Sequence, residues 1–511
     1  MSRRAWLGLL GAAVAVGLVV FAVQRNKKRA MSPITPGPDT TVIAGPLDAA
    51  GLIDYETALN EKLKGKSTAD TNAVVLLLQV IGPKVEGQEP HPDFYRWLGC
   101  SPPPPVALYL ANASLYFSQE LEGDNAQQFH DHQSVLRSLP WTAEDEPKHA
   151  VWVTSHEKPL AAATEAAKRP DYFYPLIARK PDGTRDNLIG AMLPHVQKVR
   201  EVASILSLRV MLRCGEKKYD AAWDDVMTMH RLARLVAKGG TLIETLTGIA
   251  LDHIARNSAL RCLEAAKPTA TQALAWRDEL AKLPPFPPLA DKVTTSERFT
   301  FLDVVQFVRR DGKEALKMFG VTGSHDESWE AVLASMPRTD WDQVLRTGNG
   351  WYDRFADALR KPSRDERIAA FKLLNDELNG LRRSPVDFGE RLVTLFLPAM
   401  DKVSEASDRQ EVRFRTEVLA FALAAHFADL KKYPAKLADL VPKYAATIPD
   451  DIYSGKPLIY KPTATGYELY SVGTNGKDDG GQSLDDEPRG DDYGVRMPFM
   501  KRTPTPGDDR R

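Results

Sequence analysis

Residues 388–430 read FGERLVTLFLPAMDKVSEASDRQEVRFRTEVLAFALAAHFADL, and this stretch decides the fold of the C-terminal part of the chain. Its pattern predicts one long helix that contains a single proline, Pro398, near its beginning. The tripeptide KYP at 432–434 ends this helix, because a proline cannot continue it. The segment Lys436–Val441 predicts a short further helix before Pro442.

The pattern after these helices changes from helical to extended. Leu458–Lys461 and Tyr467–Val472 predict two strands, and the short turn at Thr463–Gly466 joins them into a hairpin. The run GTNGKDDGG that begins at Gly473 is too rich in glycine to continue a strand, so it predicts a loop. The end of the chain is therefore expected to form a small α+β domain, with one long helix and a short antiparallel sheet.

The middle of the chain predicts helical hairpins. Between residues 195 and 264, apolar side chains recur at helical spacing in three successive segments, which are separated by short glycine-containing connections. Helices joined by short connections pack as antiparallel neighbours. The expected fold class is therefore mainly α, with solenoid-like helical hairpins that lack a fixed repeat period, together with the C-terminal α+β domain.

Helix-start and helix-stop signals place further elements on both sides of these hairpins. One helix is predicted to start near Asp70, where Thr71 and Asn72 precede the apolar run 73–81, and to stop at a Gly-Pro pair. Another is predicted from Thr142 towards Lys168, where Asp145 completes a capping-box spacing. Beyond the segment PPFPP at 284–288, which is the expected internal boundary, the predicted helices are Ser296–Arg309, Trp341–Leu359 and Asp365–Leu381.

The N-terminal segment has the composition of a membrane anchor. Residues 5–23 carry no charged side chain, and as a helix they would extend about 28 Å, close to the hydrocarbon thickness of a bilayer. We expect one uncleaved transmembrane helix; a cleaved secretory signal is the alternative. Basic residues flank both ends of this segment, so charge alone does not orient it.

The net charge of −1 hides a difference between the anchor and the body. Residues 1–29 contain six basic and no acidic side chains, which leaves a body of 61 basic and 68 acidic residues. An acidic body argues against nucleic-acid binding, which needs a basic face. The expected parts are an anchor (1–29), a Pro-rich spacer (30–46), a helical domain (47–283), a second helical region (289–384), the C-terminal domain (385–494) and a flexible tail (495–511).

The order of motifs in the C-terminal domain resembles the major, G-type pseudopilin of bacterial type II secretion systems. The resemblance covers residues 388–492 and rests on the helix with its early proline, DRQ at 408–410, KYP at 432–434, PDDIYSGKP at 449–457 and NGK at 475–477. It implies a helix-plus-sheet domain, a place in the bacterial inner membrane, and partners among envelope or secretion proteins. The body from 47 to 383 resembles large membrane-anchored bacterial proteins of unknown function, which implies no activity.

The chain also departs from that family. The stretch that corresponds to the apolar N-terminal half of a pseudopilin helix is internal here and spans only residues 392–400, too short to cross a bilayer. The segment at 5–23 lacks the family's processing motif. We therefore expect a pseudopilin-like domain carried on an anchored protein rather than an ordinary pilus subunit.

In that family the loop after the hairpin binds calcium, and the positions matching the family loop here are Asn475, Asp478, Asp491 and Asp492. Residues 478–492 hold seven carboxylates and one basic side chain, Arg489. Calcium requires several hard oxygen ligands on a flexible turn. Two interpretations of this stretch stay open: a loop that binds calcium as a cofactor, and a disordered acidic tail. Because calcium is abundant outside the cytoplasm, the first interpretation favours an extracytoplasmic body.

The sequence contains no catalytic motif, so whether the chain is an enzyme stays open. His130 and His132 lack a third metal ligand nearby in sequence, and His149 and His156 lack the spacing of a zinc protease. His230 lies in an apolar helical pattern and is predicted to be a core histidine. We therefore expect a scaffold or interaction protein. The alternatives are an envelope hydrolase, with a site in a groove between the helices of 195–264 and those after 289, and a component of type II secretion.

Overall fold

The computed structural model describes residues 31–84, 90–104, 109–110, 116–117, 125–178, 187–191, 193–318, 336–383, 388–397, 399–463, 465–484 and 486–499. The predicted membrane anchor at 5–23 lies outside these ranges, as does the chain beyond residue 499. Within the described ranges, no helix combines the length and the apolar character that crossing a membrane requires.

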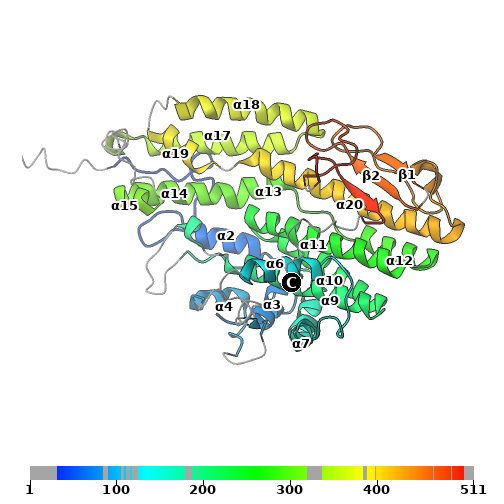
Figure 1. Ribbon diagram of the computed structural model, residues 1–511. Helices are drawn as coiled ribbons and strands as arrows, with labels where there is room; N and C mark the ends of the chain where they lie inside the picture. The colour runs from blue at the N-terminus through cyan, green and yellow to red at the C-terminus, as the bar shows by residue number, and fades with distance from the viewer. Residues whose placement is uncertain are drawn as a thin grey trace, which may run out of the picture. The chain divides into compact units, whose positions relative to one another are not determined.

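The described part of the chain is mainly helical and carries one small antiparallel sheet near its C-terminus (Figure 1), which confirms the predicted fold class at this level. Its helices up to residue 281 are α2 (Tyr55–Lys64), α3 (Ala73–Ile81), α4 (Pro92–Leu98), α6 (Asn125–Leu136), α7 (Pro147–Ser155), α8 (Glu157–Ala166), η2 (Leu188–Gly190), α9 (Pro194–Gly215), α10 (Tyr219–Lys238), α11 (Leu242–Ala266) and α12 (Ala270–Ala281).

Further helices and the three strands follow. The helices are α13 (Leu289–Lys292), η3 (Val293–Glu297, a π-helix), α14 (Arg298–Asp311), α15 (Lys313–Met318), η4 (Met336–Arg338), α17 (Trp341–Leu359), α18 (Arg364–Arg383), α19 (Phe388–Phe396), α20 (Met400–Leu430) and η5 (Leu437–Leu440). The strands are β1 (Ile459–Pro462), β2 (Tyr467–Ser471) and β3 (Tyr493–Met497).

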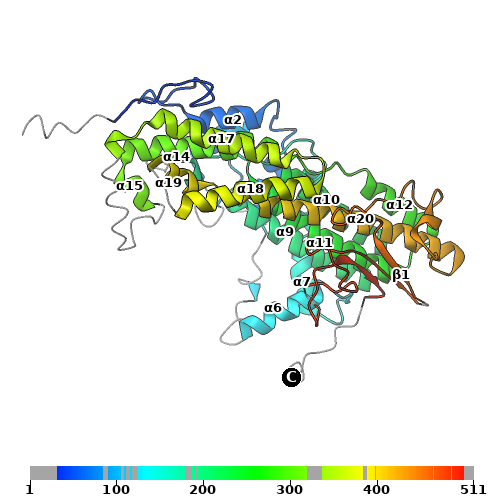
Figure 2. The same ribbon diagram turned by 90° about the horizontal axis from the view of Figure 1, so that it is seen from above.

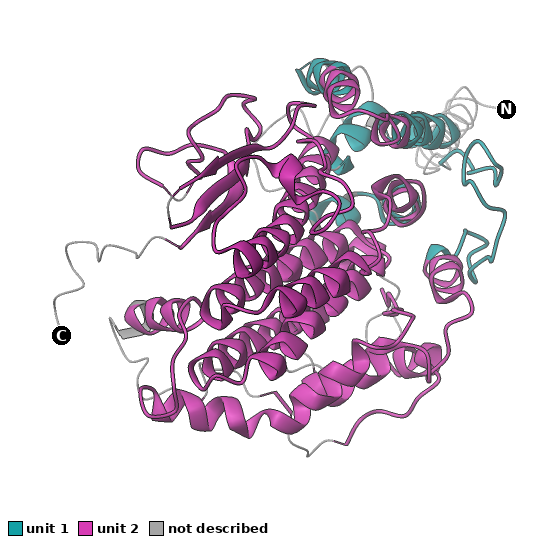
Figure 3. Cartoon of the chain, turned by 90° about the vertical axis from the view of Figure 1, so that its right-hand side faces the viewer, with its two compact units in different colours: residues 1–55, 300–354, 373–398 teal, residues 56–299, 355–372, 399–511 magenta. Residues whose placement is uncertain are grey.

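Two compact units divide the chain, and each is built from segments that are separate in sequence (Figure 3). Unit 1 comprises Met1–Tyr55, Thr300–Arg354 and Leu373–Pro398, and unit 2 comprises Glu56–Phe299, Phe355–Lys372 and Ala399–Arg511. The proline-rich segment at 284–288, expected as a boundary, lies inside unit 2 between α12 and α13. The contiguous domain ranges expected from the sequence therefore stay a prediction.

Unit 2 is organised around the helices that the 195–264 pattern predicts. These are α9, α10 and α11, and α20 lies beside α11 in both views (Figures 1 and 2). Gly248 of α11 permits a close approach to α10, because a Cβ there would lie 2.6 Å from the Ala233 carbonyl oxygen. Trp223 of α10 stacks on Trp276 of α12 with ring centroids 4.9 Å apart, and Phe421 of α20 closes the group at 5.2 Å from Trp223.

Two helix predictions need correction. The stretch 388–430 forms α19 and α20 rather than one helix. In the sequence Pro398 falls between them, outside the described residues, and a proline has no N–H with which to continue a helix. The predicted capping box at Thr142 forms, with the Asp145 N–H donating to Thr142 Oγ1 at 3.3 Å, but it closes a turn. The helix begins only at Pro147, and a second helix begins after His156 because Pro159 cannot donate a backbone hydrogen bond to this turn.

The predicted hairpin is confirmed, and the structure adds a third strand. β1 pairs antiparallel with β2, and β2 pairs antiparallel with β3, with Leu469 opposite Val495. Leu469 and Val495 are buried on one face, and β2 and β3 both contact α20. Gly494 is required in β3, since a Cβ there would lie 2.3 Å from the Leu469 carbonyl oxygen. The loop from 473 to 492, where the calcium ligands are predicted, is therefore held at both ends by strands.

Candidate metal centre

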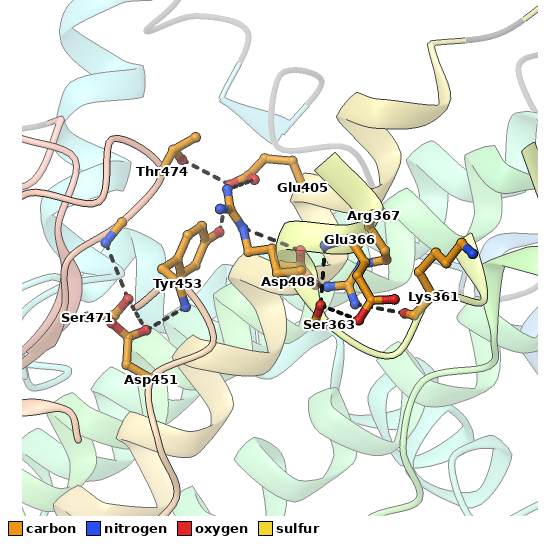
Figure 4. A network of polar contacts seen from close by, with 12 residues as sticks. Lys361, Ser363, Glu366, Arg367, Glu405, Asp408, Asp451, Tyr453, Ser471 and Thr474 are labelled. Carbon is orange, nitrogen blue, oxygen red and sulfur yellow. Dashed lines mark hydrogen bonds and ion pairs between the residues drawn. The ribbon is translucent and has the colours of Figure 1, made fainter. Parts of the chain in front are cut away.

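A network of polar contacts fixes the beginning of the acidic loop (Figure 4). Buried Asp451, only 2% exposed, accepts hydrogen bonds from the Ser471 hydroxyl at the end of β2, at 2.6 Å, and from the Tyr453 backbone N–H, at 3.0 Å. Asp451 thereby ties the segment before β1 to the point where β2 ends. These hydrogen bonds therefore fix the position at which the loop begins, directly after β2.

Glu405 of α20 extends this network into the loop (Figure 4). Its Oε1 accepts hydrogen bonds from the Tyr453 hydroxyl at 2.6 Å and from the Thr474 hydroxyl at 3.0 Å. Its Oε2 lies 3.0 Å from Arg364 Nη2, and this guanidinium also covers the Tyr453 ring at 4.3 Å. The long helix therefore positions Thr474, the residue directly before the predicted ligand Asn475.

Three carboxylates of the loop converge beyond Thr474. Asp479, Asp491 and Asp492 each offer an oxygen, and these three atoms lie within 4.8 Å of one another. Backbone N–H groups hold carboxylate oxygens of these residues: Asp492 Oδ2 accepts hydrogen bonds from the N–H of Gly481 at 2.7 Å and from that of Asp479 at 3.1 Å. The main chain thus orients the carboxylates toward a common point instead of leaving them to separate.

Buried carboxylate oxygens at this point have no hydrogen-bond partner. Asp492 is 1% exposed, and its Oδ1, like Asp491 Oδ1, contacts no donor in the described part of the chain. A buried charged oxygen that lacks a donor costs free energy unless a cation or water satisfies it. Both oxygens belong to residues of the three-carboxylate cluster, so a cation bound there would satisfy them.

The pKa of Asp492 also shows that its negative charge is unfavourable in this environment. Burial, together with the charges of Asp479 and Asp478, raises the pKa of Asp492 from 3.8 to about 6, although the N–H groups of Gly481 and Asp479 act in the opposite direction. Like charges that share a site disfavour the ionised form. A divalent cation at the cluster would remove this repulsion and keep all three carboxylates ionised.

The four ligands predicted from the sequence do not all lie in the carboxylate cluster. Asp491 and Asp492 belong to the cluster, and Asn475 adjoins it, because its side-chain amide donates to Asp479 Oδ2 at 2.9 Å. Asp478 lies in another set of contacts, where it accepts a hydrogen bond from the Tyr470 hydroxyl at 2.8 Å and lies 4.0 Å from Lys461 Nζ. The sequence argument did not choose Asp479, although it lies among the seven acidic residues of the loop.

The chemistry of the cluster suits a hard cation. Carboxylate oxygens are the ligands of calcium and magnesium, and no nitrogen or sulfur ligand belongs to the group of Asp479, Asp491 and Asp492. Calcium takes six to eight oxygens in flexible geometry, so about three protein carboxylates would leave several positions for water or backbone carbonyls. Magnesium requires stricter octahedral geometry. The three carboxylates by themselves suit either of these hard cations.

The hydrolase alternative gains no support from a cavity in the described part of unit 2. This cavity, of about 390 Å³, is lined by α3, α8 and the segment after α4, and not by α9–α11, where a hydrolase groove was expected. Its ionisable lining includes Cys100, Tyr109 and Lys158. Burial raises the pKa of the Cys100 thiol and of the Tyr109 hydroxyl, which keeps both protonated. A protonated thiol is a poor nucleophile.

The core of unit 2 contains a second concentration of charge around His230. This residue is fully buried, as predicted for a core histidine, and its Nδ1 lies 2.7 Å from Asp252 Oδ1 while its Nε2 lies 3.2 Å from Glu417 Oε1. Asp252 also accepts hydrogen bonds from Arg234 and, at 2.8 Å, from Gln410. The network thus joins the buried faces of α10, α11 and α20, and we interpret it as stabilising the packing of these helices.

Comparison of the chain with protein-family models, with curated proteins and with solved structures found no match. The pseudopilin resemblance therefore stays a prediction that rests on the motifs themselves.

Proposed function

We propose that this protein is a membrane-anchored helical scaffold whose C-terminal helix-plus-sheet domain binds calcium in the loop between β2 and β3. The observation that carries the proposal is the convergence of Asp479, Asp491 and Asp492, two of which have a buried oxygen that meets no donor among the described residues. The order of α20, the hairpin and an acidic loop is also the order expected from the pseudopilin resemblance.

Calcium in this loop would act on the surface that the domain presents. The loop connects β2 to β3, and its start is attached to α20 through Glu405 and Thr474. An ion bound at the cluster would therefore link Asp479, in the first half of the loop, to Asp491 and Asp492, directly before β3. A scaffold of this kind would engage its envelope or secretion partner only where calcium is present.

The test is a thermal melt of the full-length chain in detergent, with and without calcium. The full chain is needed because α20 packs against α11 and α12, which a C-terminal fragment would lack. A ligand at about 100 times its dissociation constant stabilises the folded state by about 2.7 kcal/mol. We expect millimolar calcium to raise the melting temperature, and we expect Asp492→Asn to abolish the increase.

A matched control lies in the same loop. Glu487 is 86% exposed and belongs to neither the cluster nor the Glu405 network, so Glu487→Gln removes one loop charge without removing a ligand. Its calcium response should equal that of the unmodified chain. Equal responses in Glu487→Gln and Asp492→Asn would show that calcium acts through general charge screening, and the proposed site would be wrong.

The proposed anchor and location rest on the uncharged segment at 5–23, with the body on the extracytoplasmic side of a bacterial inner membrane. Alkaline extraction should leave the full chain in the membrane fraction and release a chain that begins at residue 31. Protease added to spheroplasts should digest the body. A body protected from protease would place it in the cytoplasm, where calcium is scarce, and would contradict the calcium-dependent scaffold.

A further inference from the structure

Two histidines and a glutamate from separate elements of unit 2 form a second cluster of metal-ligating groups. His132 comes from α6, His149 from α7, and Glu146 directly precedes α7. One ligand atom from each of the three residues lies within 4.8 Å of the others. We propose that His132, Glu146 and His149 bind a transition-metal dication, zinc in the first instance, independently of the calcium loop.

The distances already approach those of a coordinated ion. Glu146 Oε1 lies 3.0 Å from His132 Nε2, and Glu146 Oε2 lies 3.2 Å from His149 Nδ1. Zinc bonds to histidine nitrogen and carboxylate oxygen at about 2.0–2.2 Å, which in a tetrahedron separates neighbouring ligand atoms by about 3.3–3.6 Å. An ion can therefore enter between the three side chains with only small movements.

Local structure holds two of the ligands in place. Glu146 occupies the N-cap position of α7, but its side chain makes no capping hydrogen bond and instead faces both histidines. His149 is stacked on Phe117, with ring centroids 4.8 Å apart and planes inclined by 27°. Packing thus fixes the imidazole whose Nδ1 faces Glu146.

The donor set separates this site from the acidic loop. Two imidazoles and one carboxylate suit zinc and related first-row ions, whereas calcium prefers oxygen ligands alone. The His132 and Glu146 side chains are 45% and 25% exposed, so solvent reaches one side of the cluster, while His149 is 8% exposed. An ion held by these three ligands would keep a further position for water or another exchangeable ligand.

The experiment is a zinc titration of the full-length chain, purified without a polyhistidine tag, in competition with a chromogenic chelator. The titration is made with calcium in excess and in the Asp492→Asn background, so that the acidic loop does not contribute. We expect one zinc ion per chain. His132→Ala should weaken zinc binding at least about tenfold, because the ion loses one of three protein ligands.

His130→Ala is the matched control, since His130 is an exposed histidine on the same helix and lies outside the cluster. It should bind zinc as the unmodified chain does. Glu146→Gln, which keeps the side-chain shape, should weaken binding and alter the visible absorption of the cobalt-substituted chain. Equal zinc affinity in His132→Ala and His130→Ala, or no zinc bound at about 10 µM, would show that the cluster is only a His–Glu–His hydrogen-bond relay. Neither result bears on calcium binding.

Discussion

Asp252→Asn should be among the most damaging single changes in unit 2. Asp252 is 4% exposed, and its two oxygens receive His230 and Arg234 of α10 and Gln410 of α20. An asparagine keeps nearly the same shape but removes the negative charge. The two cationic neighbours on α10 then face an uncharged amide in the protein interior, with Glu417 as their remaining buried counter-charge in this network.

The size of the loss follows from these contacts. Hydrogen bonds that involve charged groups contribute about 1.5–3 kcal/mol each, and Asp252 receives two from cationic donors. Removing one partner of a buried ion pair costs about 3–5 kcal/mol. The two hydrogen bonds amount to about 3–6 kcal/mol. Together with the ion-pair value, this predicts a decrease of about 3–5 kcal/mol in the free energy of unfolding. Urea unfolding followed by circular dichroism measures this decrease.

A surface ion pair provides the comparison. Glu377 is paired with Arg354, and both side chains are about half exposed, at 50% and 44%. Glu377→Gln should therefore cost less than about 1 kcal/mol. The reasoning is refuted if Asp252→Asn shifts the urea midpoint no more than Glu377→Gln does, because burial of the network would then contribute nothing.

Three further predictions concern the core and the loop. Burial alone lowers the pKa of His230, but Glu417 and Asp252 raise it from 6.5 to about 9. The protonated imidazole therefore contributes about 3 kcal/mol to the free energy of unfolding below pH 6.5, and this contribution is lost as the pH rises through 9. Melts from pH 6 to 10 should show this loss, and His230→Gln should lack it. Gly248→Ala should lower the free energy of unfolding by about 1–3 kcal/mol, because the added Cβ would meet the α10 backbone. Gly380→Ala should instead stabilise α18 by about 0.5–1 kcal/mol in the same melts, because its Cβ would have no described atom within 4 Å. Asp478→Asn should weaken calcium binding much less than Asp492→Asn does in a calorimetric titration, since Asp478 lies outside the cluster and acts on it only through its charge.

Elements with strong local signals could be predicted from the sequence. Asn72 caps α3 by accepting a hydrogen bond from the Val74 N–H, and the helices at 194–266 follow the apolar periodicity between short turns. The hairpin β1–β2 followed from two short apolar runs around a turn. In each case the decisive interactions join residues that are near neighbours in the chain.

The remaining features depend on contacts between distant residues. β3 has only five residues, and its pairing with β2 crosses the whole acidic loop, so the alternation of Tyr493, Val495 and Met497 was a weak signal. The sequence does not distinguish Asp479 from its acidic neighbours, because only the folded loop brings it close to Asp491 and Asp492. Likewise, Glu146 lies 14 residues from His132, and the turn before α7 is what joins them.

The central claim is that a cation completes the cluster of Asp479, Asp491 and Asp492. The most direct measurement is calorimetric titration of calcium into the full-length chain and into Asp492→Asn, at neutral pH. We expect one calcium ion per chain in the unmodified protein and at least about tenfold weaker binding in Asp492→Asn. Equal calcium binding by the two chains, or none in either at millimolar calcium, would contradict it.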